Sequence, residues 1–139
     1  MMNISKSRTK DLAKGIAFLL RVLGQPERLS ILLVIGNGEA CVCHLEAALG
    51  LRQAYISQHL MALRDADIVI ARREGRNIFY RLKNPQALDL IQLAGGLAGV
   101  TSAEINSGIQ SIDLLNCPCP HCTSKDELQP GLEVRKYSR

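Results

Sequence analysis

The fold is indicated by residues 42–82, which read VCHLEAALGLRQAYISQHLMALRDADIVIARREGRNIFYRL. Apolar residues recur at helical spacing in 42–49 and again in 53–66, and only Gly50, Leu51 and Arg52 separate the two segments. Two compact helices joined by such a tight turn form a helix-turn-helix unit. An ordinary helical hairpin has the same local pattern, so the following residues decide between the two.

A basic β-hairpin comes directly after these helices. Segments 68–72 and 78–82 are rich in strand-forming residues, and the charged residues 73–77 between them form a turn in which Gly75 can adopt a positive φ. A helix-turn-helix followed by such a hairpin, the wing, is a winged helix. The sequence therefore predicts a mainly α protein with a small β-hairpin, of the winged helix-turn-helix class.

The second helix of the unit is the expected DNA-reading helix, because its N-terminal residues would meet base edges while its apolar face joins the core. Gln side chains can bind adenine through two hydrogen bonds, and arginines on the hairpin suit phosphate or minor-groove contacts. Two of the candidates, Tyr55 and His59, have an alternative role in packing. The candidate DNA contacts are Arg52, Gln53, Tyr55, Ser57, Gln58, His59, Arg72, Arg73 and Arg76.

Helical patterns flank this unit on both sides. A polar, basic arm at 3–10 precedes an apolar stripe at Leu12, Ile16, Leu19 and Leu23, and a strongly apolar helix is expected from 27 to 35. Further helices are expected at 85–98, where small residues would allow a helix–helix dimer contact, and at 101–115, which begins with a capping box. We predict a DNA-binding and dimerisation domain at 1–115 and a Cys/Pro-rich tail at 116–139.

The composition excludes several classes of protein. Of the 139 residues 47% are hydrophobic, which excludes a disordered chain, and no apolar run is long enough to span a bilayer. Seven basic and three acidic side chains lie between residues 50 and 83, so seven minus three gives the whole net charge of +4 within that segment. With no secretory signal evident, we expect a cytoplasmic protein. No acid/base pair, nucleophile motif or phosphate loop indicates an enzyme.

Five cysteines in a cytosolic chain indicate a metal site or a redox-active thiol. On a regular helix Cys41 and Cys43 would point about 200° apart, so holding one ion requires an irregular backbone at Cys41 or a bend on binding. Soft ions select thiolates, and two are too few for As(III) or Sb(III), which take three, or for Cd(II) or Pb(II), which take three or four. The expected site joins Cys41 and Cys43 to members of a second cluster, Cys117, Cys119 and Cys122.

Other ligands and roles remain open at this point. His44 and His121 are additional candidate ligands, and the C-terminal cluster alone has spacing that suits a structural zinc site. The same thiols also suit a redox or persulfide sensor, in which a cysteine of the first pair bonds to a tail cysteine. A constitutive DNA-binding protein with a zinc tail is a third alternative.

Four segments together resemble the ArsR–SmtB family. They read LGQPERLSIL at 23–32, EACVCHL at 39–45, ISQHLxxLR at 56–64, and REGR at 73–76 with YRL at 80–82. The resemblance implies a homodimeric winged helix-turn-helix repressor, dimerised through its first helix and the helix after the wing. It also implies that the apo-protein binds operator DNA and releases it when an inducer binds.

The Cys-x-Cys motif resembles the thiolate motif of the family's arsenic, cadmium and lead sensors, with two departures. His44 stands where that motif usually has Asp, and Glu46 stands where some arsenic sensors have a third Cys. The family's zinc site on the dimer helix is not evident, since Asp89 is its sole candidate in 86–98. We therefore predict a repressor that releases operator DNA when As(III)/Sb(III) or Cd(II)/Pb(II) binds the cysteines.

Overall fold

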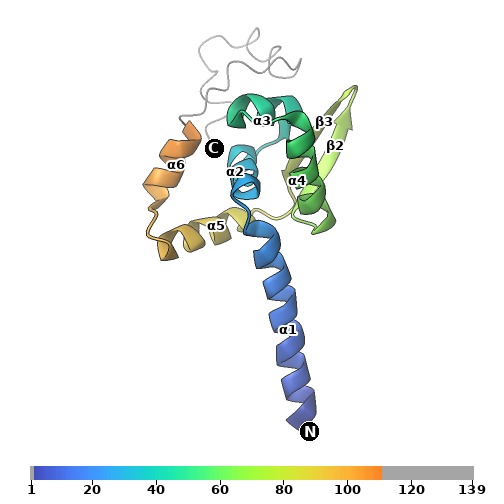
Figure 1. Cartoon of the computed structure of the whole chain (residues 1–139), viewed down its shortest axis with the longest axis vertical. Helices are drawn as coiled ribbons and strands as arrows, with labels where there is room; N and C mark the ends of the chain where they lie inside the picture. The colour runs from blue at the N-terminus through green and yellow to red at the C-terminus, as the bar shows by residue number, and fades with distance from the viewer. Residues whose placement is uncertain (1, 111–139) are drawn as a thin grey trace.

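The winged helix-turn-helix class is confirmed by a computed structural model, which describes the backbone of residues 2–110 and the side chains of residues 7–107. A three-stranded sheet packs beside a cluster of short helices, and one long helix extends away from both (Figure 1). In chain order the elements are α1 (Met2–Leu23), α2 (Pro26–Ile35), β1 (Ala40–Cys41), α3 (Val42–Leu49), α4 (Gln53–Asp65), β2 (Val69–Glu74), β3 (Asn77–Leu82), α5 (Gln86–Leu97) and α6 (Ser102–Gln110).

Helix α2 forms the centre of the core, as its apolar composition predicts. Pro26 occupies its first turn, where the missing N–H costs no hydrogen bond. Ile31 and Leu32 are fully buried and pack in one cluster with residues of α3, α4, β3 and α5. Helices α5 and α6 lie on one side of α2, and the β2–β3 hairpin lies on the other (Figure 1).

The turn between α3 and α4 depends on a glycine. Gly50 caps α3 in the left-handed conformation (φ 65°), and its N–H donates to the carbonyl of Glu46 at 2.8 Å. Residues with a Cβ adopt this conformation at a cost, so Gly is favoured here. Helix α4 then buries the stripe expected from its periodicity, with Ile56, Leu60 and Leu63 at most 1% exposed.

The sheet has the order β1-β3-β2, with both pairings antiparallel. Glu74 pairs with Asn77, so the hairpin turn is only Gly75-Arg76, and the expected turn over 73–77 is too long. Gly75 has a φ of 61°, and glycine at the first central position suits a two-residue hairpin turn. The two-residue strand β1 was not expected. It pairs with β3 and places Cys41 directly opposite Phe79.

Helix α1 is longer than expected, because it includes the segment 3–10 that we interpreted as an arm. It extends from the body as a separate rod (Figure 1). Val22 and Leu23 at its C-terminal end are buried, at 9% and 5% exposed, whereas Leu12 and Ile16 are 62% and 59% exposed. Within the described chain, therefore, only the C-terminal half of the stripe joins the core.

The capping box at the start of α6 is confirmed. The N–H of Glu104 donates to Thr101 Oγ1 at 3.2 Å, and the backbone N–H of Thr101 donates to Glu104 Oε2 at 2.7 Å. A Cβ on Gly95 would lie 2.9 Å from Ile105 Cδ1, so this glycine already allows a close contact between α5 and α6 of one chain.

The expected end of the last helix at 115 and the tail at 116–139 lie outside the described residues. No helix within residues 2–110 has both the length and the apolar character needed to cross a bilayer.

Candidate DNA interface and cysteine site

The exposed face of α4 holds most of the residues predicted to read DNA. Arg52 caps the helix, and Gln53, Tyr55 and Gln58 are exposed on its first turns, while Ser57 is half-buried. Met61, two turns after Gln53, is also 64% exposed on this face, and it was not among the residues predicted to contact DNA. An exposed methionine beside the apolar stripe was the available signal, since a thioether can contact a thymine methyl group as other apolar side chains do.

His59 lies on the buried side of α4, which favours its packing role over a phosphate contact. Its side chain is 8% exposed, its Nδ1 accepts a hydrogen bond from Arg28 Nε at 3.2 Å, and its ring meets Tyr55 edge-on with centroids 4.6 Å apart. Arg28 also donates from Nη1 to the carbonyl of Val22 at 2.9 Å. This network joins α4 to α2 and to the last turn of α1, so it fixes the position of the reading helix in the body.

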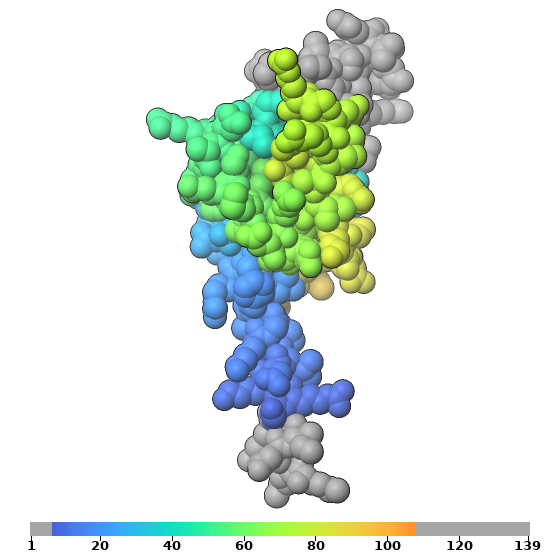
Figure 2. Space-filling model, turned by 90° about the vertical axis from the view of Figure 1, so that its right-hand side faces the viewer, coloured from blue at the N-terminus to red at the C-terminus, as the bar shows by residue number. Residues whose placement is uncertain are grey.

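The hairpin lies beside α4, and both form part of the face of the molecule that Figure 2 shows. Arg73 and Arg76 are exposed there, and no carboxylate among the described residues forms an ion pair with either. Their guanidinium groups are therefore available to phosphates. The arrangement of a neutral helix face beside a basic hairpin suits base reading by α4 and backbone binding by the wing.

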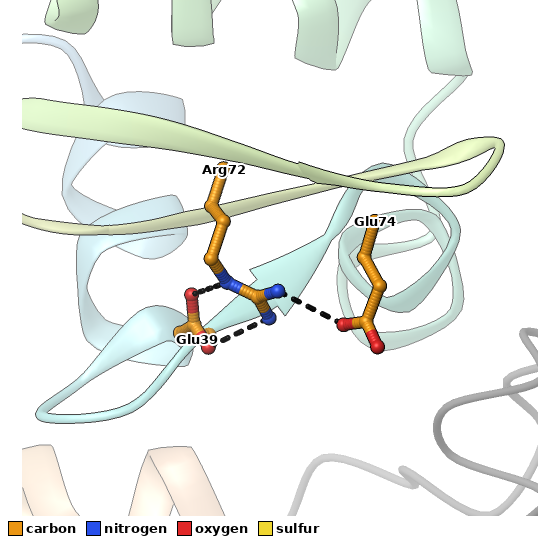
Figure 3. Close-up of polar contacts among 3 residues, drawn as sticks. All are labelled: Glu39, Arg72 and Glu74. Carbon is orange, nitrogen blue, oxygen red and sulfur yellow. Dashed lines mark hydrogen bonds and ion pairs between the residues drawn. The ribbon is translucent and has the colours of Figure 1, made fainter.

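Arg72 differs from its two neighbours because it is bound within the chain. Its Nε and Nη2 donate to the two carboxylate oxygens of Glu39, each at 3.1 Å, and its Nη1 donates to Glu74 Oε2 at 2.9 Å (Figure 3). These hydrogen bonds with the two carboxylates raise the pKa of Arg72 above its ordinary value. The guanidinium also lies over the Phe79 ring, 5.0 Å from its centroid. Arg72 is thus less suited to a phosphate contact than Arg73 or Arg76.

The thiols of Cys41 and Cys43 converge, with their Sγ atoms 2.8 Å apart. Cys41 is the N-cap of α3 and has an extended backbone (φ −86°, ψ 167°), and its Sγ accepts from the N–H of His44 at 3.4 Å. This is the irregular backbone that a shared ion requires. The cause is local, because a residue at the N-cap precedes the helical repeat that would point the two thiols apart.

The surroundings of the pair are apolar. Cys41 is 2% exposed and packs with Phe79, and the half-buried Cys43 and Ala47 pack against this cluster. His44 is also buried, but in the described part of the chain no third Cys, His, Asp or Glu completes a metal-holding group. The other predicted ligands, Cys117, Cys119, Cys122 and His121, lie outside the described residues.

Comparisons with known proteins agree with this architecture. The family model for "bacterial regulatory protein, arsR family" matches residues 25–71. The chain is similar to the biofilm growth-associated repressor of Agrobacterium fabrum, with 45% identity over 80 residues, which are 58% of this chain and 68% of the relative. It is also similar to the arsenic resistance transcriptional regulator ArsR1 of Pseudomonas putida, with 45% identity over 74 residues, 52% of this chain and 54% of the relative.

Solved structures show the same fold. The homodimeric winged helix-turn-helix DNA-binding domain Mb0332 of Mycobacterium bovis matches with a TM-score of 0.59 and 30% identity, over 66% of this chain and 85% of that one. Reduced HlyU from Vibrio cholerae matches with a TM-score of 0.59 and 30% identity, over 65% of this chain and 95% of that one.

Proposed function

Because the chain belongs to the ArsR family of bacterial regulatory proteins, we propose that it is a transcriptional repressor whose hold on operator DNA is released when a soft ion binds its cysteines. The observation that carries the ion-sensing part is the 2.8 Å approach of the Cys41 and Cys43 thiols at the start of α3. This pair lies at the start of α3, the first helix of the helix-turn-helix, so a ligand held there acts on the element that presents α4.

DNA binding is supported by the surface that α4 and the hairpin share. The outward residues of α4 over Gln53–Gln58 are uncharged and, apart from Ala54, polar, which suits hydrogen bonds to base edges in the major groove. The exposed Arg73 and Arg76 supply charge for the phosphates beside it. The sequence relatives are named as repressors and transcriptional regulators, which agrees with a DNA-binding protein and not with an enzyme.

A homodimer is supported by apolar side chains that one chain leaves exposed. Leu12 and Ile16 on α1, and Leu93 and Leu97 on α5, are between 59% and 93% exposed. Large apolar residues gathered on two helices are typical of a surface that another chain covers. We propose that α1 and α5 of two chains cover each other, which would place two α4 helices for the two halves of an operator.

The chemical class of the inducer follows from sulfur ligands. Thiolates favour soft ions, so As(III), Sb(III), Cd(II) and Pb(II) are the proposed inducers, with zinc as a further candidate. Cys41 and Cys43 supply two thiolates, and Cys117, Cys119 or Cys122 of the same or the partner chain would supply the rest. Such a site would tie the C-terminal segment to α3 and favour a conformation that holds DNA weakly.

The test is a DNA-binding titration with arsenite, antimonite, cadmium, lead and zinc in parallel, in the presence of a reductant. We expect at least one soft ion to release a duplex that the protein has selected from a random library. The double variant Cys41→Ser/Cys43→Ser should bind the duplex and fail to release it. Ala47→Ser is the matched control, because it adds a hydroxyl to the same cluster and keeps both thiols.

Normal release from the double serine variant would contradict the proposed site. Metal that copurifies with the protein, together with no effect of any added ion, would indicate the structural zinc tail instead.

The thiol geometry also supports a second candidate function, a redox sensor. Two thiols 2.8 Å apart need little movement to form a disulfide, in which a peroxide takes two electrons and two protons from the pair and leaves as water. The two functions separate on stoichiometry, because a redox sensor would bind no ion in reductant and would lose DNA after treatment with hydrogen peroxide.

A further inference from the structure

Four side chains from the three strands, and a fifth from the residue just before β1, lie on one face of the sheet. Cys41 is directly opposite Phe79, and Phe79 is directly opposite Arg72, so the three form one row across β1, β3 and β2. Side chains alternate along a strand, so Glu39, two residues before Cys41, and Glu74, two residues after Arg72, face the same way. The sheet thus brings the cysteine site and the wing into one continuous set of contacts.

Arg72 spans this row. From β2 it reaches past the central strand and binds both carboxylate oxygens of Glu39, which immediately precedes β1 (Figure 3). In doing so it lies over Phe79, whose ring is 2% exposed and packs against Cys41. Phe79 is therefore in contact with the guanidinium of Arg72 and with the cluster that contains the thiols. A displacement of Cys41 cannot leave both contacts unchanged.

We infer that Arg72 and Glu39 are positioning residues that couple the thiol pair to the wing, and that Arg72 is not primarily a DNA contact. This inference rests on the proposed function and assigns a route for its regulation. When the thiols hold no ligand, the paired carboxylate and guanidinium hold β2 against the segment that leads into β1. The next residue, Arg73, and the turn residue Arg76 are then presented to phosphate. A ligand that moves Cys41 changes the packing of Phe79 and so weakens the contact that holds β2 against the segment before β1.

The chemistry of the pair suits positioning more than folding stability. Arg72 is 44% exposed and Glu39 31% exposed, and exposed ion pairs contribute little to stability. A guanidinium that binds two oxygens at once fixes an orientation, whereas an ammonium acts as a point charge. Arg72→Lys therefore keeps the charge and loses the fixed geometry, and Glu39→Gln keeps the size of its partner.

The experiment uses the thermodynamic rule that two coupled binding sites affect each other's affinity by the same factor. If the thiol pair and the wing are coupled, bound DNA must weaken arsenite binding by the same factor by which arsenite weakens DNA binding. The arsenite Kd of the full chain is measured by calorimetry in reductant, alone and with a saturating duplex that the wild type has selected from a random library. The proteins are the wild type, Arg72→Lys, Glu39→Gln, their double variant, and Arg81→Gln as a control that removes a charge from β3.

For the wild type we expect DNA to raise the arsenite Kd by about tenfold, within the usual range of such couplings. Arg72→Lys and Glu39→Gln should each reduce this ratio at least threefold, and the double variant should reduce it no further, because the two side chains act as one unit. Arg81→Gln should retain the ratio. The inference is overturned if both single variants stay within twofold of the wild-type ratio, or if their effects multiply in the double variant.

A wild type that binds no arsenite would exclude this ion as the inducer, and the coupling would still be measurable in another way. The rate at which N-ethylmaleimide alkylates Cys41 and Cys43, resolved by peptide mass spectrometry, is then compared with and without the duplex. A DNA-dependent rate that is lost in Arg72→Lys and kept in Arg81→Gln supports the inference. A wild-type rate that DNA does not change overturns it.

Discussion

The wing should contribute to DNA binding through Arg73 and Arg76, and salt dependence measures that contribution directly. Each neutralised phosphate contributes about 0.9 to the slope of log affinity against log salt concentration. In a dimer one arginine position acts twice, so Arg73→Gln or Arg76→Gln should lower the slope by about 1.8. Between 50 and 200 mM salt, a fourfold change, the wild type should then lose roughly 12-fold more affinity than either variant.

The assay is fluorescence anisotropy of a labelled duplex, selected by the wild type from a random library, at a series of KCl concentrations. Lys14→Gln is the control, because it removes one positive charge from α1, away from the hairpin. Both arginines are exposed and have no carboxylate partner among residues 7–107, so neither substitution removes an ion pair described there. Slopes for Arg73→Gln and Arg76→Gln that equal the Lys14→Gln slope would refute the proposal that the wing binds phosphates.

Three further predictions follow from burial and hydrogen bonding. Leu60→Ala should lower the free energy of unfolding by about 3–5 kcal/mol, because Leu60 is only 1% exposed. Met61→Ala on the same helix should change it by less than about 0.5 kcal/mol, because Met61 is 64% exposed. Both values are measured by urea unfolding at one protein concentration, and equal losses would contradict the burial of Leu60 in the core. Ile16→Lys should raise the dimer dissociation constant on the order of 100-fold, because the Ile16 side chains of both chains would no longer bury apolar surface in the interface. The constant is measured by sedimentation, and an unchanged value would exclude α1 from the interface. Hydrogen bonds from Thr101, chiefly from its backbone N–H and also from its hydroxyl, lower the pKa of Glu104. The stability that this cap gives to α6 is therefore fully present above the ordinary pKa of 4.5 and is lost as the pH falls through the pKa of the folded state. An NMR titration of Glu104 that shows no shift relative to Thr101→Ala would contradict this.

The helices and the hairpin were predictable because burial imposes a period on the sequence. Ile56, Leu60 and Leu63 mark the buried face of α4, and the segment ends within one residue of the expected position. Glycine at positions 50 and 75 marked both turns for the same reason that the structure needs it, a positive φ. The convergence of the thiols was also accessible, since Cys41 precedes the first regular turn of α3.

The remaining features depend on contacts between distant residues. Strand β1 has two residues and exists only because it pairs with β3, so no local pattern reveals it. The ion pair of Arg72 joins residues 33 positions apart, and an arginine on a hairpin has the same local sequence whether it binds phosphate or Glu39. The role of His59 had a signal, because it lies three residues after Ile56 and next to Leu60, on the edge of the buried stripe.

The exposed first half of α1 has a consequence for the amount of protein in the cell. If two chains cover each other's α1 as proposed, a newly made chain presents this apolar rod to proteases until it meets a second copy. Below the dissociation constant of the pair, most chains would be monomers and would stay open to degradation. The regulator would then have a lower limit of abundance set by turnover, and its level would fall steeply, not gradually, when synthesis slows.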